Sequence, residues 1–200
     1  MSEKKGFISE FLERVIGVCF LRGEKYREII EDPEAVYQGA SVVIGVSAIS
    51  AFSGFIGRML LLRMGKVGRL SLSRFTLLRI FFSKLTVPLE IVITVLLWII
   101  GTAVVWWFSR VLGGKRGFKD LLSLTGYSEA PLILGIARAI PVIGRAIFFI
   151  GVIWTLCCWI YSVKEACELE TYKVVAVFVM TGIVLLIILA VTIASMVFLR

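Results

Sequence analysis

Five long apolar runs, separated by charged connectors, dominate the pattern of hydrophobic and polar positions along this chain. The runs cover residues 38–57, 85–108, 127–144, 146–163 and 174–199. A membrane-spanning helix needs about 20 mostly apolar residues to cross about 30 Å of hydrocarbon, and the second and fifth runs exceed that length. A soluble core of buried helices is the alternative, but whole turns without a polar face disfavour it. The pattern predicts an all-α, polytopic integral membrane protein, with a bundle of five transmembrane helices over residues 38–200.

A shorter stripe of apolar residues before the first run predicts an N-terminal amphipathic helix. Glu10, Glu13 and Arg14 interrupt what would be the apolar core of a signal peptide, so we do not interpret the segment as one. We interpret residues 1–37 as a cytosolic segment whose helix lies on the membrane surface or against the bundle, with its charges opposite the stripe. The stripe has helical spacing and consists of Ile8, Phe11, Leu12, Val15, Ile16 and Cys19.

Composition narrows the classes of function that fit. Hydrophobic residues make up 59% of the chain and charged residues 18%, against about 25% charged in an average soluble domain. The chain contains no histidine and no asparagine, which excludes histidine-based catalysis, histidine-containing metal sites and N-linked glycan acceptors. Its four cysteines show no spacing typical of a disulfide framework or a metal site. We therefore expect no bound cofactor and no metal.

The net charge of +8 owes much to the connector after the first run, residues 58–84, which contains basic residues and no acidic one. Such a stretch suits anionic lipid headgroups, at about 1 kcal/mol for each basic side chain near the surface. Ordinary loop charges that fix the orientation of the chain explain it as well. Nucleic-acid binding is not expected, because no recognition motif or aromatic platform accompanies the charges. The residues expected to contact headgroups are Arg58, Arg63, Lys66, Arg69 and Arg74.

Small side chains line one face of the first run. Ser50 with Gly54, and Ser53 with Gly57, have the small-xxx-small spacing that lets transmembrane helices approach closely. Packing inside the bundle is one interpretation of this face. Contact with a second copy of the chain or with another membrane protein is the other.

Three ionisable residues, Glu90, Glu129 and Arg138, lie within the apolar runs or at their mouths. A charge near the centre of a span costs about 2.5–3.5 kcal/mol, so each needs a partner or water. Because consecutive spans alternate in direction, Glu90 near the start of the second and Arg138 near the end of the third fall at a similar depth. We predict that these two form an intramembrane ion pair. Glu129 would lie on the opposite face of an α-helix from Arg138 and toward the other membrane surface.

The connector between the second and third runs carries the most specific pattern in the chain. Its glycines predict a loop that can adopt positive φ angles and approach another surface closely. Phe118 and Leu121 predict a short docked helix that Gly126 would end, and Pro131 falls at the start of the next helix, where a missing N–H costs little. The spacing excludes a phosphate-binding loop. The positions of this motif are Gly113, Gly114, Gly117, Phe118, Gly126, Tyr127, Glu129 and Pro131.

This glycine loop, Phe-led helix, Gly-Tyr pair and proline resemble the Yip domain family, the Ypt/Rab-interacting membrane proteins. The five-run layout and the Trp-bearing segment 154–166 are also similar to that family, and residues 113–134 carry the tightest match. The chain is nearest the compact prokaryotic type, because the longer cytosolic N-terminal domain of eukaryotic members is missing. The resemblance implies a membrane adaptor without catalytic residues, with its N-terminus inside. For the compact type it does not imply direct contact with a Rab-type GTPase.

The sequence leaves two functions open. The first is a non-enzymatic adaptor or scaffold of membrane organisation or trafficking, which uses the loop 113–126 and the N-terminal helix to hold partner proteins or to shape the bilayer. The alternative is a small transporter or channel component that uses Glu90, Glu129 and Arg138 in a third span broken by Pro131 and Pro141. A lipid-modifying enzyme is disfavoured, because the acids near the connector follow no catalytic spacing. The host membrane is the cell membrane of a prokaryote or a secretory-pathway membrane of a eukaryote. The numbers of basic residues on the two sides of the membrane are nearly equal, so the positive-inside rule gives little preference for either orientation.

Overall fold

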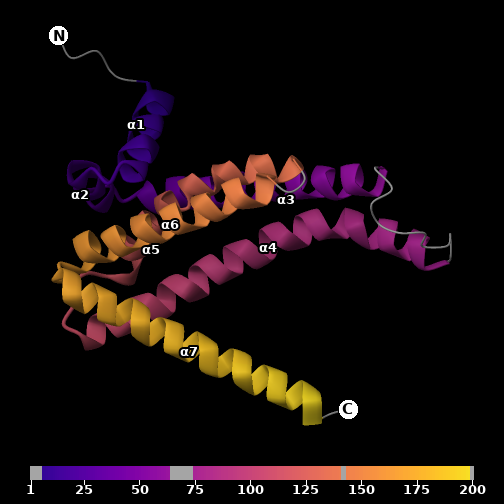
Figure 1. Ribbon diagram of the computed structural model, residues 1–200. Helices are drawn as coiled ribbons and strands as arrows, with labels where there is room; N and C mark the ends of the chain where they lie inside the picture. Colours follow the sequence, from indigo (N-terminus) through magenta and orange to yellow (C-terminus); the bar gives the residue numbers. More distant parts are fainter. Residues whose placement is uncertain (1–5, 64–73, 141–142, 199–200) are drawn as a thin grey trace.

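The computed structural model describes residues 6–63, 74–140 and 143–198, and within these ranges the chain forms helices and no strand. α3 packs against α4, the 3-10 helix η1 packs against both α3 and α6, and α7 extends away from α3 (Figure 1). The elements are α1 (Phe7–Cys19), α2 (Gly23–Glu31), α3 (Ala35–Arg63), α4 (Arg74–Val111), α5 (Phe118–Ser128), the 3-10 helix η1 (Ala130–Ala139), α6 (Ile143–Cys167) and α7 (Thr171–Phe198).

Three helices in the described part of the chain are long and apolar enough to cross a membrane. They occupy Ala35–Leu60, Val87–Val111 and Ile143–Cys167, and a shorter apolar stretch covers Thr171–Ile187. The predicted all-helical fold with long apolar spans is confirmed. The predicted count of five transmembrane helices is not, since the third run has a different form.

That third run does not form one continuous helix. It begins in the last turn of α5 and continues as η1, where the Leu132 N–H donates to the Glu129 carbonyl at 3.0 Å in the i→i+3 pattern of a 3-10 helix. Pro131 has no N–H to donate, and its ring disfavours an α-helical conformation at the residue before it. The chain therefore leaves α-helical geometry at this point. Pro141 lies outside the described residues.

The segment from α5 into η1 nevertheless runs along the length of α3. A Cβ atom added at Gly126 would lie 2.8 Å from the backbone of Gly39, and one added at Gly57 would lie 2.2 Å from the Arg138 carbonyl oxygen. In an α-helix, the stretch from Gly39 to Gly57 measures about 27 Å at about 1.5 Å per residue. Residues 126–138 cover a similar length with fewer residues, because a 3-10 helix rises about 2.0 Å per residue.

The first two helices, α1 and α2, form a hairpin that we call the N-terminal cap. Val18 of α1 and Tyr26 of α2 are fully buried, and the Tyr26 hydroxyl donates to the Val18 carbonyl at 3.1 Å. The cap packs against α5 and α6, so the main hydrophobic cluster lies at this end of the bundle, which we call the cap end. Fully buried members of the cluster include Leu121, Leu124, Val163, Val174 and Val177.

The predicted stripe of α1 is divided between two faces. Phe11, Val15 and Cys19 pack against the main cluster, whereas Ile8, Leu12 and Ile16 are exposed. Arg14 was expected among the charges on the outer side, but it is only 5% exposed. The expectation was wrong because α2 folds back along α1 and brings carboxylates to the guanidinium.

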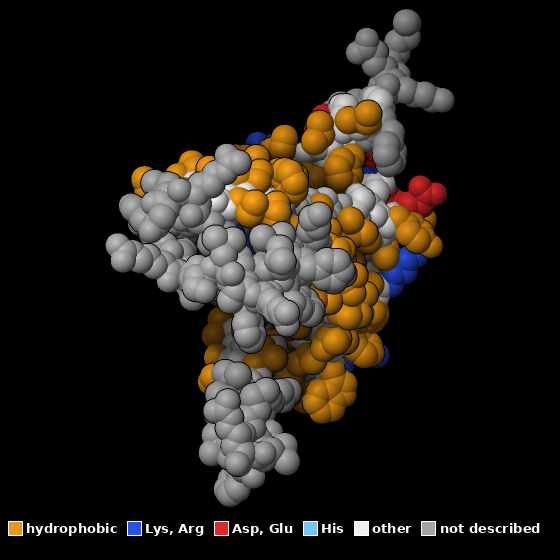
Figure 2. Space-filling view, turned by 90° about the vertical axis from the view of Figure 1, so that its right-hand side faces the viewer, with side chains coloured by type: hydrophobic (Ala, Val, Ile, Leu, Met, Phe, Trp, Pro, Cys, Tyr) orange, Lys and Arg blue, Asp and Glu red, His pale blue; other side chains and the backbone are white. Residues whose placement is uncertain are grey.

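Beyond the cap end, the long helices present apolar side chains outward. Figure 2 shows hydrophobic side chains over most of the described surface on one face of the molecule. Such exposure suits a bundle whose solvent is lipid, because hydrocarbon does not drive apolar side chains inward. α4 contains Pro88, which removes a helical hydrogen bond and accounts for the bend of α4 in Figure 1.

Candidate functional site

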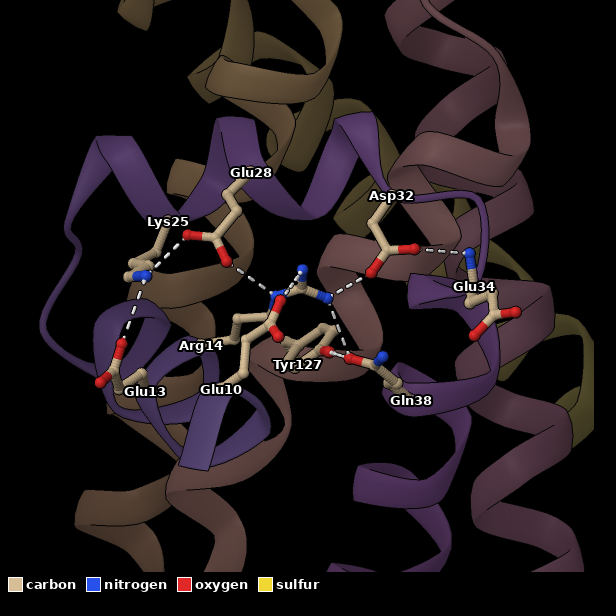
Figure 3. A network of polar contacts seen from close by, with 9 residues as sticks. All are labelled: Glu10, Glu13, Arg14, Lys25, Glu28, Asp32, Glu34, Gln38 and Tyr127. Carbon is tan, nitrogen blue, oxygen red and sulfur yellow. Dashed lines mark hydrogen bonds and ion pairs between the residues drawn. The ribbon is translucent and has the colours of Figure 1, made fainter. Parts of the chain in front are cut away.

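Arg14 is the centre of a polar cluster that joins the cap to the bundle (Figure 3). Its guanidinium donates from Nε to Glu28 Oε1 at 3.0 Å, from Nη2 to Glu10 Oε1 at 2.8 Å and from Nη1 to Gln38 Oε1 at 3.1 Å. Nη1 also donates to Asp32 Oδ2. Because the Arg14 side chain is only 6% exposed, its charge depends on these partners rather than on water.

The same cluster reaches three further elements. The Tyr127 hydroxyl of α5 donates to Gln38 Oε1 of α3. The same amide oxygen therefore accepts hydrogen bonds from Arg14 of α1 and from Tyr127 of α5. Lys25 Nζ lies 2.6 Å from Glu28 Oε2 and 3.7 Å from Glu13 Oε2, which ties α2 back to α1 (Figure 3). The cluster thus links α1, α2, α3 and α5 through side chains alone.

The pKa values of the cluster follow from these contacts. Burial raises the pKa of the Asp32 carboxyl, but the hydrogen bonds from Arg14 and from the Glu34 backbone N–H outweigh it and leave the pKa below its ordinary value. Burial likewise raises the pKa of Glu28, and the hydrogen bonds from Lys25 and Arg14 lower it overall. The pKa of Arg14 is raised, because hydrogen bonds to Asp32 and Glu28 outweigh its burial. All three groups are therefore charged near neutral pH.

We expect the cap to loosen in acid. Because the folded pKa values of Asp32 and Glu28 lie below their ordinary ones, their contribution is complete above about pH 4, the ordinary carboxyl range, and is lost as the pH falls through the folded values. Amide hydrogen exchange in α2, corrected for the intrinsic effect of pH, should stay level between about pH 6 and about pH 5 and should rise as the pH falls below about pH 4. The variant Asp32→Asn should show a weaker acid response, and an unchanged response in that variant would contradict the assignment.

The glycine loop predicted to bind partners closes the end of α4. Gly113 has a φ of +97°, and its N–H donates to the Arg110 carbonyl at 3.1 Å while the Gly114 N–H donates to the Ser109 carbonyl at 2.8 Å. This pair of bonds is the Schellman arrangement that ends a helix and favours glycine. Gly117 then precedes α5 with extended backbone angles. The loop glycines thus first serve to turn the chain.

Phe118 is half-buried, and its ring packs edge-on against Trp106 with centroids 5.9 Å apart. The charged side chains of the loop, Lys115 and Arg116, are exposed and approach Glu168 at 3.6 and 3.7 Å. The short helix predicted after Phe118 is α5, whose last residues are buried rather than free. A partner that approaches the loop therefore meets charged side chains rather than the phenylalanine.

A pocket of about 410 Å³ opens beside this loop, between α2 and the end of α6. Basic and acidic side chains both line it, and Arg27 Nε lies 3.6 Å from Glu165 Oε2. Arg27 keeps 77% of its side chain exposed, so these ion pairs remain open to competition. The charged residues that line the pocket are Arg27, Glu31, Arg116, Lys164, Glu165 and Glu168.

At the end of η1 that lies away from the cap, Arg138 and Glu90 lie in contact. Arg138 Nη1 is 2.9 Å from Glu90 Oε1 and 2.8 Å from Ser50 Oγ, and the guanidinium lies 5.0 Å from the centroid of the Phe148 ring. Arg58 Nη2 lies 4.0 Å from Glu90 Oε2, with its own side chain 51% exposed. The structure thus brings together the two residues that the sequence pairs across the second and third runs.

Glu129 and Arg138 line the same cavity, of about 100 Å³, together with Glu90. The expectation that the two fall on opposite helix faces assumed 3.6 residues per turn. With about 3.0 residues per turn, positions 129, 132, 135 and 138 fall on one face. Glu129 accepts a hydrogen bond from Trp159 Nε1 of α6 at 3.0 Å.

The small-residue face of α3 packs inside the chain. Ser50, Ser53, Gly54 and Gly57 are buried, and a Cβ atom added at Gly54 would lie 3.0 Å from the Arg138 guanidinium. Gly135 of η1 approaches Ser50 so closely that an added Cβ would lie 2.5 Å from its Oγ. The face therefore contacts η1, as expected for packing within the bundle. Of the basic stretch expected at headgroups, the structure describes the side chain of Arg58, while Lys66 and Arg69 lie outside the described residues and the side chains of Arg63 and Arg74 are not described.

Sequence reasoning missed the role of Arg14, although a signal was present. Arg14 falls between Phe11 and Val18 at helical spacing, so it belongs to the face that packs inward. Gln38 stands at the edge of the first apolar run, and Trp159 lies inside the fourth, so neither attracts attention as a polar contact. Each is a polar group beside an apolar face, and only the folded structure shows which carboxylate or hydroxyl it meets.

Comparison with known proteins agrees with the resemblance. The family model described as the Yip1 domain matches residues 16–193, which include the cap helix α2, the loop, the helices α3, α4 and α6, and most of α7. No curated protein and no solved structure matches the chain.

Proposed function

We propose, from the premise that this chain belongs to the Yip1 domain family, that it is a non-enzymatic adaptor or scaffold that binds partner proteins at its cap end. The chain is a multi-pass membrane protein. The observation that carries the proposal is the charged pocket beside the loop, bordered by α2 of the cap and by Arg116 of the loop. A pocket lined by charges of both signs suits a protein surface that is complementary in charge, since rim charges mainly steer association and fix its register.

The cap gives this surface a fixed shape. α2, which forms one wall of the pocket, is held by the Arg14 cluster and by buried Tyr26 and Ile29. The opposite wall is the end of α6, with the loop residue Arg116 between them. Because both walls rest on packed helices, binding requires little ordering of the backbone, which lowers its entropic cost.

Five passes through the bilayer fit the packing, with α5 and η1 together as the third. The segment 126–138 runs beside α3 for about the thickness of a hydrocarbon core, and α7 would supply the fifth. The outer side of α1 fits an amphipathic contact with lipid: Ile8, Leu12 and Ile16 are exposed, and the Trp154 indole of α6 donates to the Cys19 carbonyl at 2.8 Å. We place the cap inside the cell and the basic residues 58–74 among headgroups of the opposite leaflet.

Photo-crosslinking in cells from position 115 tests the adaptor function. Lys115 is exposed on the loop and next to the pocket, which makes it a better site than the half-buried Phe118. The matched control is Ile143, which is also exposed but lies at the other end of α6. A dominant protein adduct from position 115 and none from 143 would support the proposal. Adducts only to lipid, or the same adducts from both positions, would contradict it.

A further inference from the structure

The cavity between α3, α4, η1 and α6 lies inside the apolar part of the bundle. Ser47 and Ser50 belong to the candidate span Ala35–Leu60, and Thr94 belongs to Val87–Val111. Its volume of about 100 Å³ has room for a few water molecules or for one small ion with part of its hydration shell. A polar space of this kind at membrane depth needs an occupant, because empty cavities are stable when their walls are apolar.

Two hydroxyl groups in the cavity wall already donate their hydrogen bonds to backbone carbonyls. Ser47 Oγ donates to the Val43 carbonyl at 2.6 Å, and Thr94 Oγ1 donates to the Glu90 carbonyl at 2.8 Å. Each oxygen therefore has only lone pairs left for an occupant. The cavity consequently offers acceptors to whatever binds between these two helices.

The charges around the cavity leave one carboxylate without a basic partner. Arg138 of η1 pairs with Glu90 of α4, and Arg58 of α3 reaches the other oxygen of Glu90 at 4.0 Å. Among the described residues, no lysine or arginine forms an ion pair with Glu129, whose contact is the Trp159 N–H at 3.0 Å. A single carboxylate in an apolar region is costly unless a positive charge or a proton neutralises it.

We propose that this cavity binds one monovalent alkali cation of the sodium type, with Glu129, Ser47 and Thr94 as its protein ligands. Carboxylate and hydroxyl oxygens are hard ligands, which suit such ions and not the soft metals that prefer sulfur or imidazole. One unpaired carboxylate balances one positive charge, and Arg138 in the same cavity disfavours a divalent ion. The site shares no lining residue with the charged pocket, so it can be tested without a partner protein.

Thermal unfolding of the full chain in detergent, in sodium chloride against N-methylglucamine chloride at equal ionic strength, tests this site. We expect sodium to raise the Tm in a saturable manner and Glu129→Gln to abolish the dependence. Ser47→Ala and Thr94→Val should each weaken the apparent sodium affinity by about tenfold or more. Ser41→Ala is the control, since Ser41 is an exposed serine of α3 outside the cavity wall, and it should leave the affinity unchanged.

The second readout is carboxyl infrared absorption, which distinguishes a cation from a proton. We expect no protonated-carboxyl band in sodium, and a band in N-methylglucamine that sodium removes and Glu129→Gln deletes. A band that persists in sodium and disappears in Glu129→Gln would show that a proton neutralises the site and would overturn the proposal. A Tm without sodium dependence, or a dependence that survives in folded Glu129→Gln, would overturn it as well.

Discussion

Replacement of Arg14 by methionine should release the N-terminal cap from the bundle. Methionine keeps the length and the helix propensity of the side chain but leaves Asp32 and Glu28 without their shared cation. Removal of one partner from a buried ion pair costs about 3–5 kcal/mol, and we expect about 3 kcal/mol because Asp32 keeps 22% of its side chain exposed. Amide exchange in α2 should then be faster by about a hundredfold.

Arg22→Met is the matched control, because Arg22 is exposed at the start of α2. It should leave the exchange of α2 within about twofold of the native protein, in line with the small effects of surface substitutions. Adding Asp32→Asn to Arg14→Met should recover part of the loss, since the unpaired carboxylate is then removed. If Arg14→Met and Arg22→Met exchange at the same rate, the cluster does not hold the cap.

Single substitutions of Glu90 or Arg138 should destabilise the bundle, and the double substitution should restore it. Glu90→Gln removes the carboxylate that faces Arg138 and leaves its guanidinium at membrane depth beside Ser50 and the Phe148 ring. Arg138→Gln leaves Glu90 with the more distant Arg58. We expect each single change to cost about 2 kcal/mol, somewhat less than an unpaired charge at a span centre, and the double variant to lie within about 1 kcal/mol of the native protein.

The measurement is the unfolding free energy, obtained by titrating the protein in mixed micelles with a denaturing detergent. Arg58→Gln serves as the control, because its exposed contact at 4.0 Å should contribute less than about 1 kcal/mol. Additive effects of the two single changes would mean that Glu90 and Arg138 act independently. In that case the contact between η1 and α4 would rest on packing alone.

The positions of the long helices could be predicted from hydropathy, because lipid imposes the same requirement on every span. The geometry of the third run could not, since apolar content does not distinguish a 3-10 helix from an α-helix. Pro131 marks where the geometry changes, but the packing of Gly135 on Ser50 and of Arg138 on Gly57 depends on contacts with α3. Those contacts join residues more than 80 positions apart, and no local pattern records them.

For the candidate sites, the alternating direction of consecutive spans was enough to predict that Glu90 and Arg138 lie at a similar depth, because it strongly constrains where each residue falls. The same reasoning failed for Glu129, since its face depends on residues per turn. Arg14 was misplaced because an arginine on a short helix is usually solvated. Its burial follows from the position of α2, which carries Glu28, is followed directly by Asp32, and buries Tyr26 and Ile29 as it folds back along α1.

The geometry of η1 also determines which changes of chain length the third pass can absorb. Removing one residue between Leu132 and Gly135 would turn everything beyond it by about 120°, and Arg138 would no longer face Glu90. Removing three residues would shorten the pass by about 6 Å but keep the same side chains toward α3. In this segment, insertions and deletions of three residues therefore keep the same face toward α3. In an α-helical pass, with about 3.6 residues per turn, no whole number of residues close to one turn would restore the face fully.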